Sequence, residues 1–531
     1  MAETWFNFGR DVVDRHAADR PEATALYVME ADGGARRYTF SDLRRLSNQT
    51  VASLRAKGVR PGDRILVMLG KDPAFWPTMV GLLKLGAVPV PGTTQLTPRD
   101  VAYRRTMADA RGAIVQAPVA ARLSADDPFP TPVKLAVGAG APGDWSGWDP
   151  FDLQEGSEDD GEPTRRTDPA LLYFTSGTTG RQKMVLHNHA YPEAHRITAE
   201  WWIGLRPDDL HWNVADTGWA KAAWSSLFGP WMVGAGIAVD PLTGKFAAED
   251  CLGLLQRHPI TSLCAPPTVY RLLVQEDCTS LRQRPLSSTV SAGEPLNPEV
   301  IAAFDAMTGL TIRDGYGQTE TVLLVGNPPG APVRPGSMGK PAPVFRMAVI
   351  DGEGRELVGE EGDIALDVSR RPPGLFEEYL GDPEGTAGRY VKTWYITGDR
   401  AVQDDEGYFW FVGRADDVII SSGYRIGPFE VESVLIEHPD VVEAAVVSSP
   451  DAIRGEVVKA FVVLRAGVEG TPELAAALQR HVQAETAPYK YPRAIEFVSD
   501  LPKTVSGKIR RVELREREWS RVRSVPESPD A

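Results

Sequence analysis

The chain has 531 residues, which is too many for one hydrophobic core, so two or more domains are expected. Its composition is that of a globular protein, with 42% hydrophobic and 24% charged residues. The formal net charge of −15 argues against a nucleic-acid partner or an anionic membrane surface, so any anion site must be a local basic pocket.

The cysteines and the apolar windows argue for a reducing compartment without a membrane span. Cys251, Cys264 and Cys278 are too widely spaced for a zinc site and predict buried free thiols. The first residues lack the basic stretch and apolar segment of a targeting peptide. The most apolar window, 79–90, is too short to cross a bilayer. We therefore expect a cytoplasmic protein.

The N-terminal part alternates strands and helices. Residues 63–69 predict a buried strand, 74–85 a helix ended by Gly86, and 87–90 the next strand. This spacing indicates a parallel α/β sheet. Residues 139–167 are rich in Gly, Pro, Asp and Glu and predict a solvated connection.

A small-residue loop then follows an apolar run at 171–174. Glycines allow the backbone to approach a ligand closely, and exposed N–H groups with hydroxyls and a lysine suit phosphates. The alternative is an ordinary turn between a strand and a helix. The spacing is not that of a Walker A loop, because Lys183 is followed by Met184. The loop residues are Thr175, Ser176, Gly177, Thr178, Thr179, Gly180 and Lys183.

The alternation of strands and helices resumes after this loop and later gives way to short strands. Strands are expected at 261–265, 289–293 and 311–315, and glycine loops after the last two lie where open α/β sheets bind ligands. Short strands from 345 to 412 with Asp-Gly and Glu-Gly turns indicate an antiparallel portion. A smaller α+β unit follows, so we predict one domain at 1–413 and another at 414–531.

Six short segments are informative because of their order along the chain. They are 175–183, Gly293-Glu-Pro295, Tyr316-Gly-Gln-Thr-Glu320, Thr397-Gly-Asp399, 413–427 and 501–510. Together they resemble the adenylate-forming superfamily of acyl-CoA synthetases, luciferases and peptide-synthetase adenylation domains, and most closely the medium-chain acyl-CoA synthetases. The resemblance implies a large N-terminal α/β domain and a smaller α+β domain that rotates between two half-reactions.

The resemblance also implies the chemistry. A carboxylate attacks the α-phosphorus of ATP to give an acyl-adenylate and pyrophosphate, and the coenzyme A thiol then displaces AMP. Thr178 and Glu320 match the Mg²⁺ position, since Mg²⁺ prefers carboxylate and phosphate oxygens. Asp399 and Arg414 match ribose contacts, with Tyr316 stacking on the base. The remaining residues of the implied adenine pocket are Gly293, Glu294, Pro295, Asp314, Gly315, Gly317, Gln318 and Thr319.

The C-terminal motifs contain the residues that the resemblance assigns to adenylation and to thioester formation. Lys508 matches the cation that reaches the α-phosphate and carboxylate during adenylation, and Asp416 matches the hinge. Without the resemblance, Lys508 is one more exposed lysine. The implied coenzyme A contacts are Gln95, Ser422, Gly423, Tyr424, Arg454, Tyr491, Pro492 and Arg493.

Position 317 indicates which class of acyl group the protein accepts. In acetate-activating relatives a tryptophan stands there and shortens the pocket, whereas Gly317 here predicts a deeper apolar cavity. A medium-chain fatty acid or an aromatic acid is therefore favoured over acetate. The predicted substrate-side residues are Trp219, Gly317, Leu323, Leu324 and Arg425, although the apolar ones are equally typical of a core.

Other functions fit less well. The near alternative passes the acyl group to the phosphopantetheine of a carrier protein, but no carrier domain follows residue 531. A non-catalytic nucleotide-binding regulator conflicts with the retained Lys508, Glu320 and Asp399. A metal site at His187 and His189 lacks further ligands. The expected partners are thus ATP, coenzyme A and a carboxylic acid, and the protein is expected to be a monomer or a homodimer.

Overall fold

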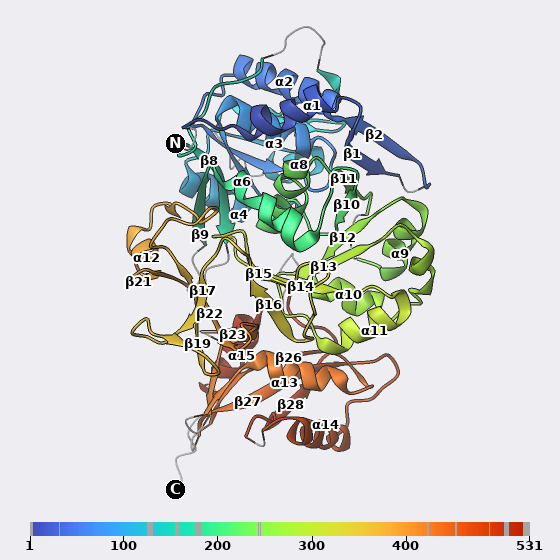
Figure 1. The fold of residues 1–531 in the computed structure, drawn as a ribbon, viewed down its shortest axis with the longest axis vertical. Coiled ribbons are helices and arrows are strands. Elements are labelled where there is room, and N and C mark those ends of the chain that lie inside the picture. Colours follow the sequence, from blue (N-terminus) through green and yellow to red (C-terminus); the bar gives the residue numbers. More distant parts are fainter. Residues whose placement is uncertain are drawn as a thin grey trace.

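The fold was analysed in a computed structural model, which describes residues 4–30, 32–124, 131–153, 159–175, 182–242, 244, 246–415, 417–421, 424–451, 454–487, 489–503 and 509–523. A large body, coloured blue to yellow in Figure 1, lies above a smaller unit coloured orange to red. The large body is α/β with an antiparallel portion and the smaller unit is α+β, which confirms the predicted fold class.

A long sheet runs through the large body and changes from parallel to antiparallel at β14. Its parallel strands are, in spatial order, β1 (Thr24–Met29), β11 (Gly236–Val239), β10 (Leu210–Asn213), β12 (Ser262–Ala265), β13 (Ser288–Ala292) and β14 (Arg313–Gly317). β2 (Ala35–Thr39) pairs with β1 at the outer edge.

The antiparallel part continues from β14. Its strands are β15 (Leu323–Gly326), β16 (Ser337–Pro341), β23 (Phe409–Arg414), β22 (Trp394–Gln403), β19 (Glu361–Asp367), β17 (Met347–Ile350) and β18 (Glu356–Leu357), with β21 (Tyr390–Val391) beside β22. The carboxyl ends of β13 and β14 therefore lie next to strands of the antiparallel part, and this junction is where the predicted ligand loops meet.

A parallel sheet near the N-terminus confirms the predicted strand–helix–strand unit. Its strands are β4 (Val88–Pro91), β3 (Arg64–Met68), β5 (Gly112–Gln116), β6 (Val133–Val137) and β7 (Ser146–Gly147). α3 (Phe75–Leu85) connects β3 to β4 and is buried along its length, including Lys84, whose ammonium forms an ion pair with Asp14 at 2.6 Å. Gly86 ends the helix with φ 74°, a left-handed conformation that glycine adopts without a Cβ penalty.

The connection at 176–181 joins other elements than the strand and helix of the ordinary-turn alternative. β8 (Pro169–Thr175) pairs antiparallel with β9 (Lys183–Asn188), and β20 (Glu378–Tyr379) extends this sheet beyond β9. The segment therefore joins two antiparallel strands and not a strand and a helix. Thr175 at the end of β8 and Lys183 at the start of β9 are register partners, so the two strands hold the ends of this connection close together.

Helices cover the sheets of the large body, and the core lies between them. Phe8, Trp202 and Trp231 are among its largest fully buried side chains. The longer helices are α2 (Phe40–Ala56), α4 (Pro98–Ala108), α5 (Ala117–Ser124), α9 (Ala248–Arg257) and α11 (Pro298–Thr308). The shorter ones are α1 (Arg15–Asp19), α6 (Tyr191–Ile197), α7 (Ala220–Ser225), α8 (Phe228–Val233), α10 (Pro267–Leu273) and α12 (Pro383–Ala387). No helix in the described ranges is long and apolar enough to cross a membrane.

The smaller unit is a sheet flanked by helices. Its strands, in spatial order, are β25 (Tyr424–Ile426), β24 (Ile419–Ser421), β27 (Gly455–Leu464) and β26 (Val441–Asp451), and β28 (Ala494–Phe497) lies parallel to β27. Its helices are α13 (Pro428–Glu437), α14 (Pro472–Glu485) and α15 (Arg511–Arg523). Val431 and Leu435 of α13 are fully buried, as the apolar spacing predicts. The domain boundary near 413–417 stays a prediction; β23 belongs to the large sheet and β24 to the small one.

Polar contacts join α13 and its neighbours to the large body. Asn297 Nδ2, just before α11, donates to Ser433 Oγ at 3.0 Å, and Arg465 Nη1 donates to Gln275 Oε1 at 3.0 Å. Figure 1 shows α13 and β26 facing upward toward α11. The rings of Phe411 on β23 and Phe429 on α13 also meet here, with 6.4 Å between their centroids. Polar contacts of this kind are typical of interfaces between domains that move relative to each other.

A cluster of carboxyl groups lies at this interface. Burial raises the pKa of Glu437 on α13 to about 7, and the neighbouring Glu299 and Glu485 carboxyls act in the same direction. His481 Nε2 lies 3.8 Å from Glu437 Oε2. Because the folded protein holds this proton more tightly than the unfolded chain does, stability falls as the pH rises from about 4.5 to about 7.

Replacing Glu437 with glutamine is expected to remove the loss of stability that the ionised Glu437 carboxylate causes. We compare the melting temperature of E437Q with that of the unmodified protein at each pH. The difference in favour of E437Q should be larger at pH 8 than at pH 5, because only the ionised carboxylate of Glu437 is unfavourable at this position. Thermal unfolding at both pH values measures the difference. The exposed Glu469 provides the matched control, E469Q, and an equal shift at both pH values for E437Q would contradict the assignment.

Candidate active site

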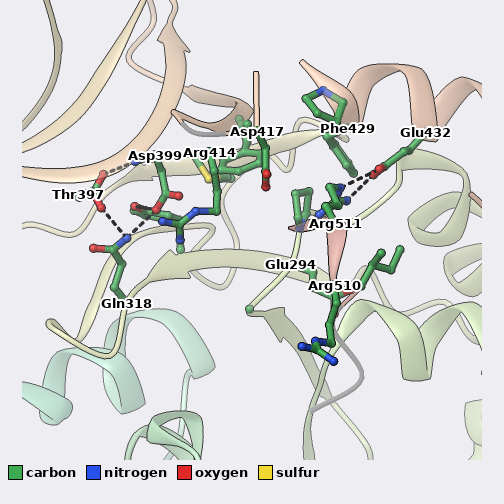
Figure 2. A pocket seen from close by; sticks show the side chains of 18 of the residues that line it. Glu294, Gln318, Thr397, Asp399, Arg414, Asp417, Phe429, Glu432, Arg510 and Arg511 are labelled. Carbon is green, nitrogen blue, oxygen red and sulfur yellow. Dashed lines mark hydrogen bonds and ion pairs between the residues drawn. The ribbon is translucent and has the colours of Figure 1, made fainter. Parts of the chain in front are cut away.

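A cavity of about 940 Å³ lies where the large body meets the smaller unit, and Figure 2 shows side chains from both around it. Every residue of the predicted ATP set that the structure describes lines this cavity. These are Thr175, Lys183, Gly293, Glu294, Pro295, Asp314, Gly315, Tyr316, Gly317, Gln318, Thr319, Glu320, Asp399 and Arg414. Ser176, Gly177, Thr178, Thr179 and Gly180 lie outside the described residues. The roles of all these residues stay predictions.

The local folding of four strands brings these residues together. β13 ends at Ala292, and Gly293 then turns the chain with φ 105°, a conformation that a side chain would strain. β14 ends at Gly317, and the following residues 318–320 enter the cavity. Asp399 on β22 and Arg414 on β23 are register partners, which places their side chains beside each other.

Asp399 is the centre of a hydrogen-bond network seen at the left of Figure 2. Its Oδ2 accepts a hydrogen bond from Tyr316 Oη at 2.6 Å and one from Gln318 Nε2 at 2.6 Å. Burial raises the pKa of Asp399, while Arg414 and these donors oppose the shift. Oδ1 lacks a hydrogen-bond partner among the described residues and lies at the cavity, where vicinal hydroxyls of a ribose would suit it. Tyr316, predicted to stack on the base, thus also uses its hydroxyl to orient Asp399.

Asp314 forms a second buried acidic group in the cavity wall. Burial raises the pKa of its carboxyl to about 8, against hydrogen bonds from the Gly315 and Leu296 backbone N–H groups. A carboxyl with that pKa carries a proton for much of the time at neutral pH, so it can donate a hydrogen bond as well as accept one. Asp314 lies in the wall that the sequence predicts to hold the adenine, whose ring nitrogens and amino group would use both abilities.

Lys183 and Glu320 occupy the other end of the cavity. Burial lowers the pKa of Lys183, Arg389 lowers it further, and Glu320 opposes the shift. The Lys183 ammonium lies 4.4 Å from the centre of the Tyr379 ring, and Tyr379 Oη donates to Glu320 Oε1 at 2.7 Å. The sequence interpretation missed Tyr379 and Arg389. They belong to a segment about 200 residues from Lys183, and only the pairing of β20 with β9 shows that they are neighbours.

The Glu320 carboxylate fits a Mg²⁺ site completed by phosphate oxygens. In the described part of the chain it accepts one hydrogen bond, at Oε1, which leaves Oε2 for a cation. The described residues hold no group of three or more His, Cys, Asp or Glu side chains that would bind a metal without a ligand. Mg²⁺ commonly binds through one or two protein carboxylates together with the phosphate oxygens of a nucleotide, and a single carboxylate such as Glu320 fits that pattern. Thr178, the other predicted ligand, lies outside the described residues.

The histidines near this site have a structural role in the described fold. His187 Nε2 donates to the Thr319 backbone oxygen at 2.8 Å, and burial lowers the pKa of His187 to about 3. Its ring stacks on Tyr191 with a centroid separation of 3.7 Å. Burial also lowers the pKa of His189 to about 4. Both rings are therefore neutral, and His187 holds the segment that carries Glu320.

The predicted coenzyme A residues whose side chains the structure describes do not line the cavity. Gln95 lies between β4 and α4, and Arg454 lies just before β27. Arg493 Nη1 donates to Tyr491 Oη at 2.9 Å on the smaller unit, beside Pro492. Tyr424 and Arg425 belong to β25, but their side chains are outside the described set, as are residues 422 and 423.

The residues nearest to the predicted catalytic lysine do line it. Ile509, Arg510, Arg511 and Val512 contribute to the cavity wall from the smaller unit. Figure 2 shows Arg511 directed toward Glu432, and the two form a paired contact at 2.9 and 2.6 Å. Lys508 itself and the predicted hinge residue Asp416 lie outside the described residues.

The space beside Gly317 differs from the sequence expectation. A Cβ at this position would lie 2.5 Å from Trp224 Cη2 and 2.3 Å from the Val322 backbone oxygen. The Trp224 ring, on α7, therefore fills the space that the glycine leaves. Leu323 and Leu324 on β15 are fully buried in the core, and Trp219 directly precedes α7. The depth of any acyl pocket here depends on Trp224, which the sequence interpretation did not identify.

Comparison with known proteins identifies the family. A model described as "AMP-binding enzyme" matches residues 13–380, and one described as "AMP-binding enzyme C-terminal domain" matches residues 430–508. The chain belongs to the AMP-binding enzyme family. This result confirms the resemblance that the order of the sequence motifs indicated.

Individual relatives match along nearly the whole chain. Acyl-coenzyme A synthetase ACSM3, mitochondrial, from Mus musculus is 44% identical, covering 97% of this chain and 91% of its own. The anthranilate CoA ligase AuaEII in complex with anthranoyl-AMP has a TM-score of 0.89 at 30% identity, covering 98% and 99% of the two chains. A benzoate CoA ligase from Burkholderia xenovorans LB400 has a TM-score of 0.85 at 28% identity, covering 96% and 100%. The mouse relative is named as mitochondrial, so a cytoplasmic location for this protein stays a prediction.

Proposed function

We propose that the protein is an AMP-forming acyl-CoA synthetase, which activates a carboxylic acid with ATP and transfers the acyl group to coenzyme A. The observation that carries this proposal is the cavity, where Lys183, Glu320, Asp399 and Arg414 of the large body face residues 509–512 of the smaller unit. The names of the relatives support the same reaction.

In the first half-reaction the large body holds the nucleotide. Asp399, oriented by Tyr316 and Gln318, accepts hydrogen bonds from the ribose hydroxyls. Lys183 and the loop before it neutralise the departing pyrophosphate, because phosphoryl and nucleotidyl transfer depend mainly on positioning and charge neutralisation. Mg²⁺ bound at Glu320 would supply further charge neutralisation.

The second half-reaction requires other residues at the same cavity. The described coenzyme A residues of the smaller unit, Arg454, Tyr491, Pro492 and Arg493, do not line the cavity, whereas residues 509–512 beside Lys508 do. We infer that this arrangement serves adenylation, and that a rotation about Asp416 exchanges the Lys508 segment for the one around Gly423. The polar contacts between the units are compatible with such an exchange.

The acyl substrate is a medium-chain fatty acid or an aromatic acid. The solved neighbours named as anthranilate and benzoate ligases support an aromatic acid, whereas the apolar residues beside Gly317 suit either class. Each methylene in an apolar pocket changes binding by only about 1–3 kcal/mol, so several acids of one class should be accepted.

Trp224 determines the accepted size in this proposal. Trp224→Ala is expected to open the space beside Gly317 and to raise the ratio of kcat/KM for a C10 acid over a C6 acid by about tenfold. Steady-state thioester assays on both acids measure this ratio. Trp5→Ala, at a tryptophan that is 51% exposed, is the control. An unchanged ratio in Trp224→Ala would show that the acyl chain lies elsewhere.

A direct assay tests the proposed function. Purified protein is incubated with ATP, Mg²⁺, coenzyme A and a panel of C2–C12 and aryl acids, and AMP, pyrophosphate and acyl-CoA are measured together. We expect all three products in equal amounts for at least one acid. Acid-dependent pyrophosphate release without acyl-CoA, in the presence of a carrier protein that becomes acylated, would instead favour the carrier-protein alternative.

A further inference from the structure

Tyr379 connects the two charged groups at the phosphate end of the cavity. Its side chain is fully buried, and its hydroxyl donates to Glu320 Oε1 at 2.7 Å. The face of the same ring lies under the Lys183 ammonium, with 4.4 Å between Nζ and the ring centre. One phenol thus contacts both the carboxylate and the lysine.

The segment that carries Tyr379 is itself fixed to both partners. The Phe376 backbone N–H donates to the Glu320 backbone oxygen at 2.8 Å, so residues 376–379 hold Glu320 by its main chain and by its side chain. Tyr379 is the register partner of Val185 on β9, the strand that begins at Lys183. Leu380 N–H donates to the Met184 backbone oxygen at 2.8 Å. The segment that contains β20 therefore bonds both to Glu320 and to the start of β9, and it fixes their positions relative to each other.

We propose that Tyr379 is a positioning residue that sets the metal-binding carboxylate of Glu320 and the phosphate-binding ammonium of Lys183 at a fixed separation. The inference rests on the proposed function, because it takes Glu320 as the Mg²⁺ ligand and Lys183 as the pyrophosphate ligand. It deepens that function by assigning a residue that contacts neither phosphate nor metal.

The hydroxyl and the ring make separate contributions. The hydrogen bond to Oε1 restricts the rotation of the Glu320 carboxylate, and Glu320 lines the cavity. Partners that orient a metal ligand in this way commonly affect metal affinity about 10–100-fold. The ring face attracts the ammonium through its quadrupole and restricts the rotamers of Lys183. Tyr379→Phe removes the first contribution, and Tyr379→Leu removes both.

The test measures nucleotide binding by calorimetry on the full chain, with and without Mg²⁺. For Tyr379→Phe we expect ATP binding in the presence of Mg²⁺ to weaken about tenfold, and binding in EDTA to stay within twofold of the unmodified protein. For Tyr379→Leu both should weaken, because Lys183 also loses its support. Tyr270→Phe is the matched control, since Tyr270 is a buried tyrosine whose hydroxyl donates to the Val290 backbone oxygen at 3.2 Å, and it should show neither change.

A double-mutant cycle removes the ambiguity of a general loss of stability. In a Glu320→Gln background, Tyr379→Phe should no longer change the effect of Mg²⁺ on ATP binding, because the positioned ligand is already gone. An undiminished effect in that background, or an equal loss with and without Mg²⁺, would overturn the inference. Because the readout is binding, it is obtained even if no acid in the panel yields acyl-CoA, and that outcome would contradict the proposed function alone.

Discussion

Lys508→Ala is expected to reduce acyl-adenylate formation by about 10²–10³-fold while leaving the second half-reaction within a few-fold of normal. A single preorganised donor aimed at developing charge commonly contributes about 3–4 kcal/mol, which corresponds to this factor. The first half-reaction is measured by acid-dependent ATP–pyrophosphate exchange. The second is measured with synthetic acyl-adenylate and coenzyme A, which bypasses the step that needs Lys508.

The surroundings of Lys508 explain why its effect should be confined to one step. Arg511, three residues later, is held by both oxygens of Glu432 on α13. Burial opposes the charge of Arg511, but Glu432 outweighs it and raises the pKa of the guanidinium above its usual value. Arg515 Nη1 donates to Asp417 Oδ1 at 2.9 Å, directly after the predicted hinge. Arg511 and Arg515 thus anchor the start of α15 to the smaller unit, so a rotation of that unit would carry this helix with it.

A nearby lysine provides the control for this prediction. Lys503 Nζ lies 2.8 Å from Glu443 Oε2 and is ion-paired at the edge of the interface. Lys503→Ala removes a positive charge from the same segment, so it reports the effect of net charge and of local stability. We expect it to change both half-reactions by the same small factor. Equal loss of both half-reactions in Lys508→Ala would contradict the role assigned to Lys508.

The sequence alone was sufficient for the family and for a set of residues that the folded chain brings to one cavity, whose roles toward a nucleotide stay predictions. Gly293, Tyr316 and Asp399 belong to short motifs whose order reflects a shared fold, and each motif follows or lies within a strand of the long sheet. The ends of the neighbouring parallel strands β13 and β14 lie at one edge of that sheet, which brings Gly293 and Tyr316 together. Asp399 joins them through its hydrogen bond with the Tyr316 hydroxyl.

The sequence could not predict contacts that depend on pairing between distant strands. Tyr379 meets Glu320 only because β20 adds to β9, and no local pattern around residue 379 indicates this. Likewise, Gly317 indicates free volume when it is considered alone. The structure shows that Trp224, more than 90 residues earlier, fills that volume. Side-chain packing across a cavity is a property of the folded chain, so a residue type at one position does not determine it.

Gly423→Leu is expected to have the opposite effect to Lys508→Ala, with thioester formation reduced at least 100-fold and adenylation within about twofold. Ser421 on β24 and Tyr424 on β25 are register partners, and Ser422 and Gly423 join these two strands. In this arrangement, none of the described residues of β24 and β25 lines the cavity, so a larger side chain at 423 should not disturb ATP or the acid. After rotation, the leucine would occupy the path of the pantetheine, which needs close backbone approach.

The two variants together test whether the smaller unit rotates. Pyrophosphate release and acyl-CoA formation are measured on the same preparation of Gly423→Leu. Ile420→Ala, at a residue on β24 that is 54% exposed, is the control and should keep both activities. If one fixed arrangement served both steps, each variant would impair both half-reactions, since Lys508 and Gly423 would act at the cavity together. Opposite losses in the two variants require that the segments around Lys508 and Gly423 occupy the cavity in turn.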